Sequence, residues 1–183
     1  MPIQSVAVFC GSRLGNNPAY AEAARTLGKG MAEAGMTLVY GGGRVGLMGE
    51  VADAVLASGG RVHGVIPEFL KKWEVEHQGV TEMQVTDGMH SRKHRMFELS
   101  DAVVALPGGI GTLDETIEIL SWRQLRLHTK PILICNVLGW AQPFISAVDA
   151  AVAQGFADPS VRAFIEVLDG PEAVLSRLAC SRP

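Results

Sequence analysis

The segment Ala102-Val103-Val104-Ala105-Leu106-Pro107-Gly108-Gly109-Ile110-Gly111-Thr112 decides the fold class of this chain. Its first five residues are all apolar and predict a buried β-strand, and the glycines that follow predict a tight turn. Residues 112–127 then have the pattern of a long helix. A strand that is apolar at every position is typical of a parallel sheet with helices on both faces.

The same order of strand, turn and helix recurs before and after this segment. We expect further strands at 5–10, 37–40, 61–66, 80–85 and 132–135, and further helices at 18–34, 47–58, 88–99, 140–153 and 171–179. This alternation predicts an α/β fold, a doubly wound, Rossmann-like, mostly parallel sheet. A length of 183 residues without a repeat or long linker predicts one nucleotide-binding domain over residues 1–183.

Composition argues against several classes of protein. The net charge of -3 disfavours a general nucleic-acid binder, which usually carries a strongly basic surface. We see no signal peptide and no apolar run near the ~20 residues of a membrane helix, so we expect a cytoplasmic protein without membrane contact. Cys10, Cys135 and Cys180 are far apart, so we expect neither a disulfide framework nor a metal site.

Three glycine-rich turns follow predicted strands, at residues 10–12, 41–46 and 107–112. The carboxyl ends of parallel strands lie at one edge of a sheet, where such folds bind ligands. A glycine-rich turn that leads into a helix exposes backbone N–H groups, which bind phosphate. Each turn alone could be only a tight connection, but three at one edge favour a shared nucleotide pocket.

The turn at 41–46 also fits the Gly-x-Gly-x-x-Gly pattern of dinucleotide-binding proteins. That fingerprint requires an acidic residue about 20 positions later, at the end of the next strand. There the chain reads His63-Gly64-Val65-Ile66-Pro67, and Glu68 comes only after the proline. An NAD-dependent oxidoreductase therefore stays an alternative with weak support. A Walker A motif is absent.

Charged residues lie close to the third turn. Asp114 and Glu115 fall in the first turn of the predicted helix, where they either compensate the helix dipole or, for Glu115, act in the pocket. Residues 90–95 form the most basic segment, which is either a solvated helix face or a source of phosphate ligands. Neighbouring helical residues differ by about 100° in direction, so Arg92 and Lys93 cannot point to the same place.

Two of these segments resemble the signature of the Lonely Guy (LOG) family, the cytokinin riboside 5′-monophosphate phosphoribohydrolases. Residues 107–115 are similar to the family pattern Pro-Gly-Gly-x-Gly-Thr-x-x-Glu, and Met89-His90-Ser91-Arg92-Lys93 resembles its Arg-Lys element. Further similarities lie at 9–12, 40–43, 46–49, Trp122, 124–125 and 130–131. The chain departs from the family pattern at Arg44, Arg123 and Arg126, which bears on substrate preference.

The resemblance implies hydrolysis of the N-glycosidic bond of a cytokinin riboside 5′-monophosphate or of AMP, without cofactor or metal. Glu115 would be the catalytic carboxylate, and Arg92 would orient Glu115 or assist the leaving base. The resemblance and the glycine turns together give the expected substrate-binding residues, which are Gly11, Ser12, Gly42, Gly43, Gly46, Met48, Met89, Lys93, Gly108, Gly109, Gly111 and Thr112. The family is usually dimeric, so we expect a homodimer.

Two other functions are compatible with the same motifs. A non-catalytic carrier of a nucleotide or cofactor would share the glycine turns but would not need Glu115 or Arg92. The family is also often labelled "lysine decarboxylase", a reaction that normally uses pyridoxal phosphate bound to a lysine. Of the five lysines only Lys93 lies near the predicted pocket, so we expect no decarboxylase.

Overall fold

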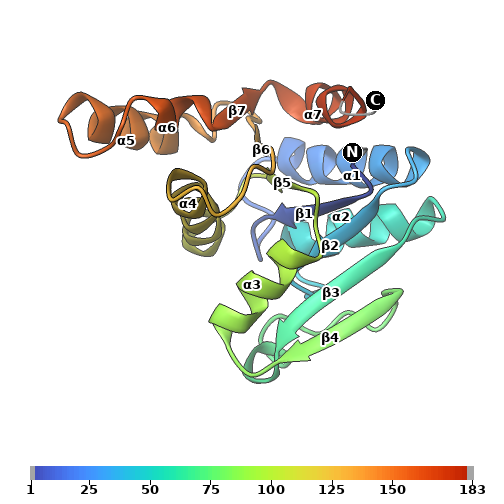
Figure 1. The fold of residues 1–183 in the computed structure, drawn as a ribbon. Helices are drawn as coiled ribbons and strands as arrows, with labels where there is room; N and C mark the ends of the chain where they lie inside the picture. The colour runs from blue at the N-terminus through green and yellow to red at the C-terminus, as the bar shows by residue number, and fades with distance from the viewer. Residues whose placement is uncertain (1–2, 181–183) are drawn as a thin grey trace.

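The computed structural model describes residues 3–180, and its centre is a sheet of seven parallel strands in the order β4-β3-β2-β1-β5-β6-β7 (Figure 1). The strands are β1 Ser5–Phe9, β2 Thr37–Tyr40, β3 Val62–Pro67, β4 Glu82–Thr86, β5 Ala102–Ala105, β6 Ile132–Cys135 and β7 Ile165–Leu168. The helices are α1 Pro18–Glu33, α2 Gly46–Ala57, η1 Glu68–Leu70, α3 Met89–Glu98, α4 Ile110–Gln124, α5 Gln142–Ala153, α6 Ser160–Ala163 and α7 Gly170–Ala179. The predicted α/β fold with a parallel sheet is confirmed.

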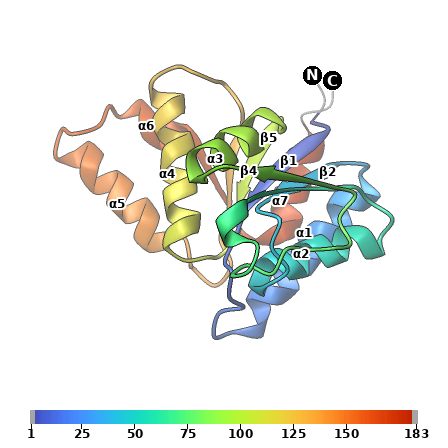
Figure 2. The same ribbon diagram turned by 90° about the horizontal axis from the view of Figure 1, so that it is seen from below.

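Helices cover both faces of the sheet. α1, α2 and α7 pack on one face, and α3, α4, α5 and α6 pack on the other (Figure 2). Successive residues of β1 therefore point into different cores: Val6 and Val8 contact the first group of helices, and Ala7 and Phe9 contact the second. This two-sided burial explains why the strands are apolar at nearly every position.

The chain reverses its winding direction beside β1. It runs outward through β2, β3 and β4 on one side of β1, and then crosses to β5 and continues through β6 and β7 on the other side. β1 pairs with both neighbours, since Val6 lies opposite Leu38 of β2 and opposite Ala102 of β5. Such a switch point leaves a crevice beyond the carboxyl ends of β1 and β5, where the first and third glycine turns lie.

Three local predictions were wrong or incomplete. α4 begins at Ile110 and not at Thr112, so Asp114 and Glu115 lie in its second turn and cannot compensate the helix dipole as expected. It also ends early, at Gln124, because Arg126 adopts a positive φ of 62°. β7 was not predicted because Glu166 interrupts its short apolar run, and this side chain forms an ion pair of 2.6 Å with Arg177 of α7.

Candidate active site

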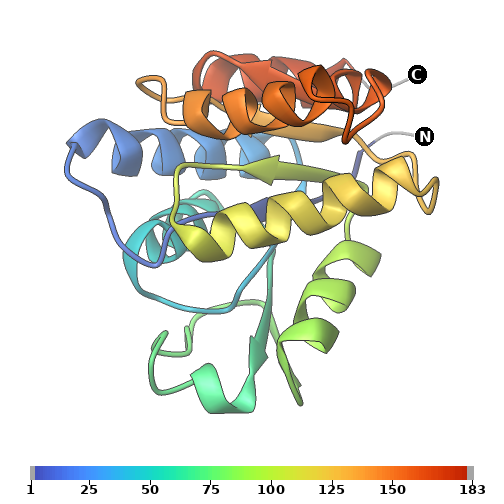
Figure 3. The ribbon, with the colours of Figure 1, turned by 90° about the vertical axis from the view of Figure 1, so that its left-hand side faces the viewer.

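A cavity of about 190 Å³ lies at the switch point, between the end of β1, the end of β2, helix α3 and the start of α4. Figure 3 shows how α4 starts directly after β5 and runs back along the sheet. Nine of the predicted site residues line this cavity: Gly11, Ser12, Met48, Met89, Arg92, Gly109, Gly111, Thr112 and Glu115. The structure therefore brings together residues from four distant parts of the sequence.

The start of α4 forms one wall of the cavity and has no side-chain cap. The first N–H donor in this turn with a backbone partner is that of Leu113, which donates to the Gly109 carbonyl at 3.1 Å. The preceding amides of Ile110, Gly111 and Thr112 have no place in the helical ladder. Together with the positive end of the helix dipole, they make this wall suited to an anion.

Glycine at position 108 permits the close packing of this turn. A Cβ there would collide with the Thr112 side chain and with the Gly11 backbone. The Gly11 amide also donates to the Pro107 carbonyl at 3.0 Å, so the first and third glycine turns are joined directly. Gly108 itself lines a neighbouring cavity and not the first one.

Glu115 lies on the cavity wall one helical turn beyond these amides. Its carboxylate makes no hydrogen bond with any residue of the described range 3–180. Burial raises the pKa of Glu115 to about 7; the Arg92 charge opposes this shift, and the Glu74 and Asp114 carboxylates add to it. Near neutral pH this group therefore exists in both protonation states, as is typical of an acid–base catalyst.

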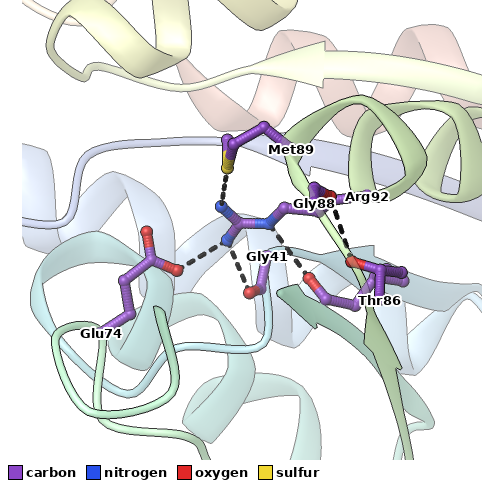
Figure 4. Close-up of polar contacts among 7 residues, drawn as sticks. Gly41, Glu74, Thr86, Gly88, Met89 and Arg92 are labelled. Atoms are coloured by element: carbon purple, nitrogen blue, oxygen red, sulfur yellow. Dashed lines mark hydrogen bonds and ion pairs between the residues drawn. The ribbon is translucent and has the colours of Figure 1, made fainter. Parts of the chain in front are cut away.

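Arg92 of α3 is 3% exposed and is held by three oxygens (Figure 4). Its Nε donates to the Val65 carbonyl at 3.1 Å, and its Nη2 donates to the Gly41 carbonyl at 2.6 Å and to the Glu74 carboxylate at 2.7 Å. Its Nη1 contacts only the weakly accepting Met89 sulfur, at 3.9 Å. Arg92 thus presents a fixed charge to the cavity and keeps donor capacity at Nη1, and it does not hydrogen-bond Glu115.

Lys93 does not line this cavity. Its amine forms ion pairs with Asp114 at 3.0 Å and Glu118 at 2.8 Å, and so connects α3 to α4. Burial lowers the pKa of Lys93, but the hydrogen bonds that its amine donates to Glu118 and Asp114 outweigh the effect of burial, and the pKa is raised. The amine is thereby held in its protonated form.

Gly42, Gly43 and Gly46 of the second turn were expected to bind substrate, but they do not line this cavity. The Gly42 carbonyl accepts a hydrogen bond of 3.0 Å from the His77 amide, and a Cβ on Gly43 would touch Glu74. Gly46 has a positive φ of 60° and packs against the backbone of Ser12. These contacts fill the turn with the protein's own groups, which leaves little space for the pyrophosphate of a dinucleotide.

Two residues of the site were missed from the sequence. Glu74 comes from the connection between β3 and β4, lines the cavity and pairs with Arg92. Trp140 lies between β6 and α5, and its indole Nε1 donates to the Gly108 carbonyl at 3.1 Å. No motif surrounds either residue. Their contacts with Arg92 and with the Gly108 carbonyl join distant parts of the sequence and become visible only in the folded chain.

The described part of the chain shows no grouping of three or more His, Cys, Asp or Glu side chains suited to a metal ion. Within residues 3–180, no helix is both long and apolar enough to cross a bilayer. All three cysteines have free thiols.

The chain is similar to known proteins over most of its length. Residues 48–178 match the model of a family described as "Possible lysine decarboxylase". A cytokinin riboside 5′-monophosphate phosphoribohydrolase of Rhodococcoides fascians is 43% identical over 176 residues, which are 96% of this chain and 89% of that protein. The enzyme of the same name, LOG, from Oryza sativa subsp. japonica is 46% identical over 171 residues, which are 93% of this chain and 71% of that protein.

Solved structures with the same fold are more distant in sequence. The molybdenum cofactor carrier protein of Chlamydomonas reinhardtii has a TM-score of 0.71 at 21% identity, and covers 95% of this chain and 94% of its own. The molybdenum cofactor binding protein of Rippkaea orientalis has a TM-score of 0.74 at 21% identity, and the match covers 97% of this chain and 96% of that protein. This likeness confirms the Rossmann-like fold alone. The identities of the curated relatives go further, and they show that this chain belongs to the Lonely Guy (LOG) family of cytokinin riboside 5′-monophosphate phosphoribohydrolases.

Proposed function

We propose that this protein hydrolyses the N-glycosidic bond of a cytokinin riboside 5′-monophosphate or of AMP, and releases the free base and ribose 5-phosphate. One observation carries the proposal: the uncapped amides of α4 and the Glu115 carboxylate line the same cavity, one helical turn apart. An anion site and a carboxylate at this short separation suit a ribose with a phosphate at C5′ and a reacting bond at C1′.

The chemistry follows from the two sides of the cavity. The amides of α4 and Ser12 bind the 5′-phosphate. As the bond from C1′ to the base breaks, its electron pair leaves with the base and positive charge develops on the sugar, as in glycoside hydrolysis. Ionised Glu115 stabilises this charge and accepts a proton from the water that attacks C1′. Arg92 Nη1 donates a hydrogen bond to the departing base, and the proton that Glu115 took from water is passed to the base, which restores ionised Glu115.

Lysine decarboxylation does not fit this site. A Schiff base to pyridoxal phosphate requires a lysine amine that can lose its proton beside the cofactor. Lys93 lies outside the cavity and is kept protonated by Asp114 and Glu118. The description of the matched family model therefore gives a poor guide to the reaction.

The test is to incubate the purified protein with AMP and with N6-isopentenyl-AMP, and to measure free base and ribose 5-phosphate by chromatography. Release from either nucleotide supports the proposal, and the ratio of the two kcat/KM values identifies the preferred base. Adenosine is the matched control for the phosphate, and we expect it to react poorly. Tight binding of AMP without any release would instead indicate a carrier.

We also propose that the protein is a homodimer that forms through α4. Three large apolar residues lie along one exposed side of this helix and its end: Ile110, Ile117 and Leu125 are 83%, 50% and 67% exposed. Their spacing of seven and eight residues keeps them on one side of the helix. Ile110 also lines the cavity, so a partner covering this stripe would lie beside the site.

We expect light scattering at micromolar concentration to give twice the chain mass of 19.5 kDa. Ile117→Glu places a charge in the centre of the stripe and is expected to shift the mass to that of a monomer. Phe156→Glu, at a residue that is 86% exposed and outside α4, is the control and is expected to leave the dimer intact. A wild-type protein of single-chain mass would contradict the proposal.

We also propose that the protein is located in the cytoplasm. Free cysteines, one of them exposed, are typical of proteins in reducing compartments.

Glu74 provides a test of the charge balance around Glu115. If ionised Glu115 is the reacting form, kcat/KM rises with pH through about 7. The Glu74 carboxylate raises the pKa of Glu115, so Glu74→Gln is expected to move this rise to lower pH while the new amide oxygen can still accept from Arg92. The measurement is kcat/KM against pH for both proteins. An unchanged midpoint would show that Glu74 does not influence the reacting group.

A further inference from the structure

The carbonyl groups of the turn before α4 are all occupied by donors of the protein. The Pro107 carbonyl accepts from the Gly11 amide at 3.0 Å, and the Gly109 carbonyl accepts from the Leu113 amide at 3.1 Å. Between them, the Gly108 carbonyl accepts from the indole Nε1 of Trp140 at 3.1 Å. The hydrogen bonds to the Pro107 and Gly109 carbonyls come from backbone amides, and only the one to the Gly108 carbonyl comes from a side chain.

We propose that Trp140 is a positioning residue for the substrate's 5′-phosphate, acting through the Gly108 carbonyl. The peptide between Gly108 and Gly109 is flanked by two glycines, which have the most freedom to rotate, and the Trp140 indole donates the hydrogen bond that holds its carbonyl. Rotation of that peptide would turn the Gly108 carbonyl oxygen away from the indole and toward the start of α4, and an oxygen near the phosphate repels an anion. This inference rests on the proposed function, which assigns the phosphate to the start of α4.

Trp140 is itself held firmly. It lies in the connection from β6 to α5, where its amide donates to the Val137 carbonyl at 3.0 Å. The next amide, of Ala141, donates to the Asn136 side chain at 3.0 Å. The indole packs at the edge of the core that includes Phe144. The segment after β6 thus holds Trp140 in place, and the Trp140 indole in turn holds the turn after β5.

The indole lies in a second cavity beside the catalytic one. It lines a larger cavity of about 500 Å³ that shares Gly11, Ser12, Gly109 and Ile110 with the catalytic one. It does not line the catalytic cavity itself. The hydrogen bond to the Gly108 carbonyl connects Trp140 to the turn before α4, so we expect its effect to concern the phosphate and not the base.

The test is Trp140→Phe, which keeps an aromatic ring and removes the N–H donor. Loss of one hydrogen bond corresponds to about a three- to tenfold change in binding. We expect KM for the nucleotide to rise by about that factor with kcat nearly unchanged, as for an interaction made equally in the ground and transition states. Calorimetry should show the same loss for ribose 5-phosphate and none for adenosine.

Trp122→Phe is the matched control. Trp122 lies on α4, packs edge-on against Phe97 at 5.2 Å between ring centroids, and lines neither cavity. Equal effects of the two substitutions, or an equal loss of adenosine and ribose 5-phosphate binding in Trp140→Phe, would overturn the inference. If the wild type releases no base from any nucleotide, the proposed function fails, and the binding of ribose 5-phosphate by the two variants still tests the role of Trp140.

Discussion

Glu115→Gln is expected to lower kcat by a factor of about 10²–10³, the usual cost of losing a preorganised group that stabilises developing charge. Glutamine keeps the size of the side chain but can neither carry the negative charge that opposes the sugar's positive charge nor accept a proton from water. Because the phosphate contacts come from the α4 amides, binding of AMP should change little. Steady-state kinetics on AMP and calorimetric titration of the variant measure the two effects separately.

The same substitution should raise the free energy of unfolding above pH 7. The pKa of Glu115 is about 7 in the folded state against 4.5 for an ordinary glutamate. An acid whose pKa is raised by folding destabilises the fold as pH increases from its unfolded value, and the effect is complete above its folded value. At pH 8 we therefore expect Glu115→Gln to be more stable than wild type by up to about 3 kcal/mol, and near pH 4 the difference should vanish.

Glu118→Gln is the control for both measurements. Glu118 lies on the same helix and pairs with Lys93 outside the cavity, so its replacement should leave kcat close to the wild-type value. A Glu115→Gln protein that retained activity within a few-fold of wild type would remove this carboxylate from the mechanism. A variant that lost activity together with its thermal transition would report unfolding, and the gain in stability expected at pH 8 distinguishes these cases.

The fold was predictable because its determinants are local. Strands such as Ala102–Ala105 are apolar throughout, and each is followed by a turn and a helix, so the alternation alone indicates a parallel sheet. β7 was missed for a reason that is not local: Glu166 is acceptable in this edge strand because Arg177, eleven residues later, supplies its partner. No pattern within the strand reports that ion pair.

The site was predictable only where a glycine turn or a family motif marked it. Gly42, Gly43 and Gly46 have the same sequence character as Gly109 and Gly111, yet they face the protein's own backbone and side chains. Sequence gives the need for a glycine but not whether a ligand or the chain itself approaches it. Sequence also misses residues that reach the site from distant parts of the chain. Glu74 and Trp140 become part of the site only when the sheet is assembled.

Arg92→Lys is expected to reduce kcat/KM by a factor of about 10² or more, although it keeps the positive charge. The guanidinium binds the Gly41 and Val65 carbonyls and the Glu74 carboxylate at once, and a single ammonium group cannot reproduce these directions and still reach the base. Thermal unfolding should also occur at a lower temperature, because a carbonyl in the core is left without a donor.

Arg92→Ala should lower both activity and stability more than Arg92→Lys does, and it should also shift the pH dependence of kcat/KM. It leaves Glu74 without a counter-charge in a partly buried position, which is strongly destabilising. It also removes the charge that holds down the pKa of Glu115, so any remaining activity should rise with pH at a higher midpoint than in wild type, opposite to the shift in Glu74→Gln. Arg95→Lys is the control, since Arg95 pairs with Gln84 and Glu98 outside the cavity. Opposite shifts of the two midpoints would establish that Arg92 and Glu74 act on one carboxylate, and shifts in the same direction would contradict the charge arrangement described above.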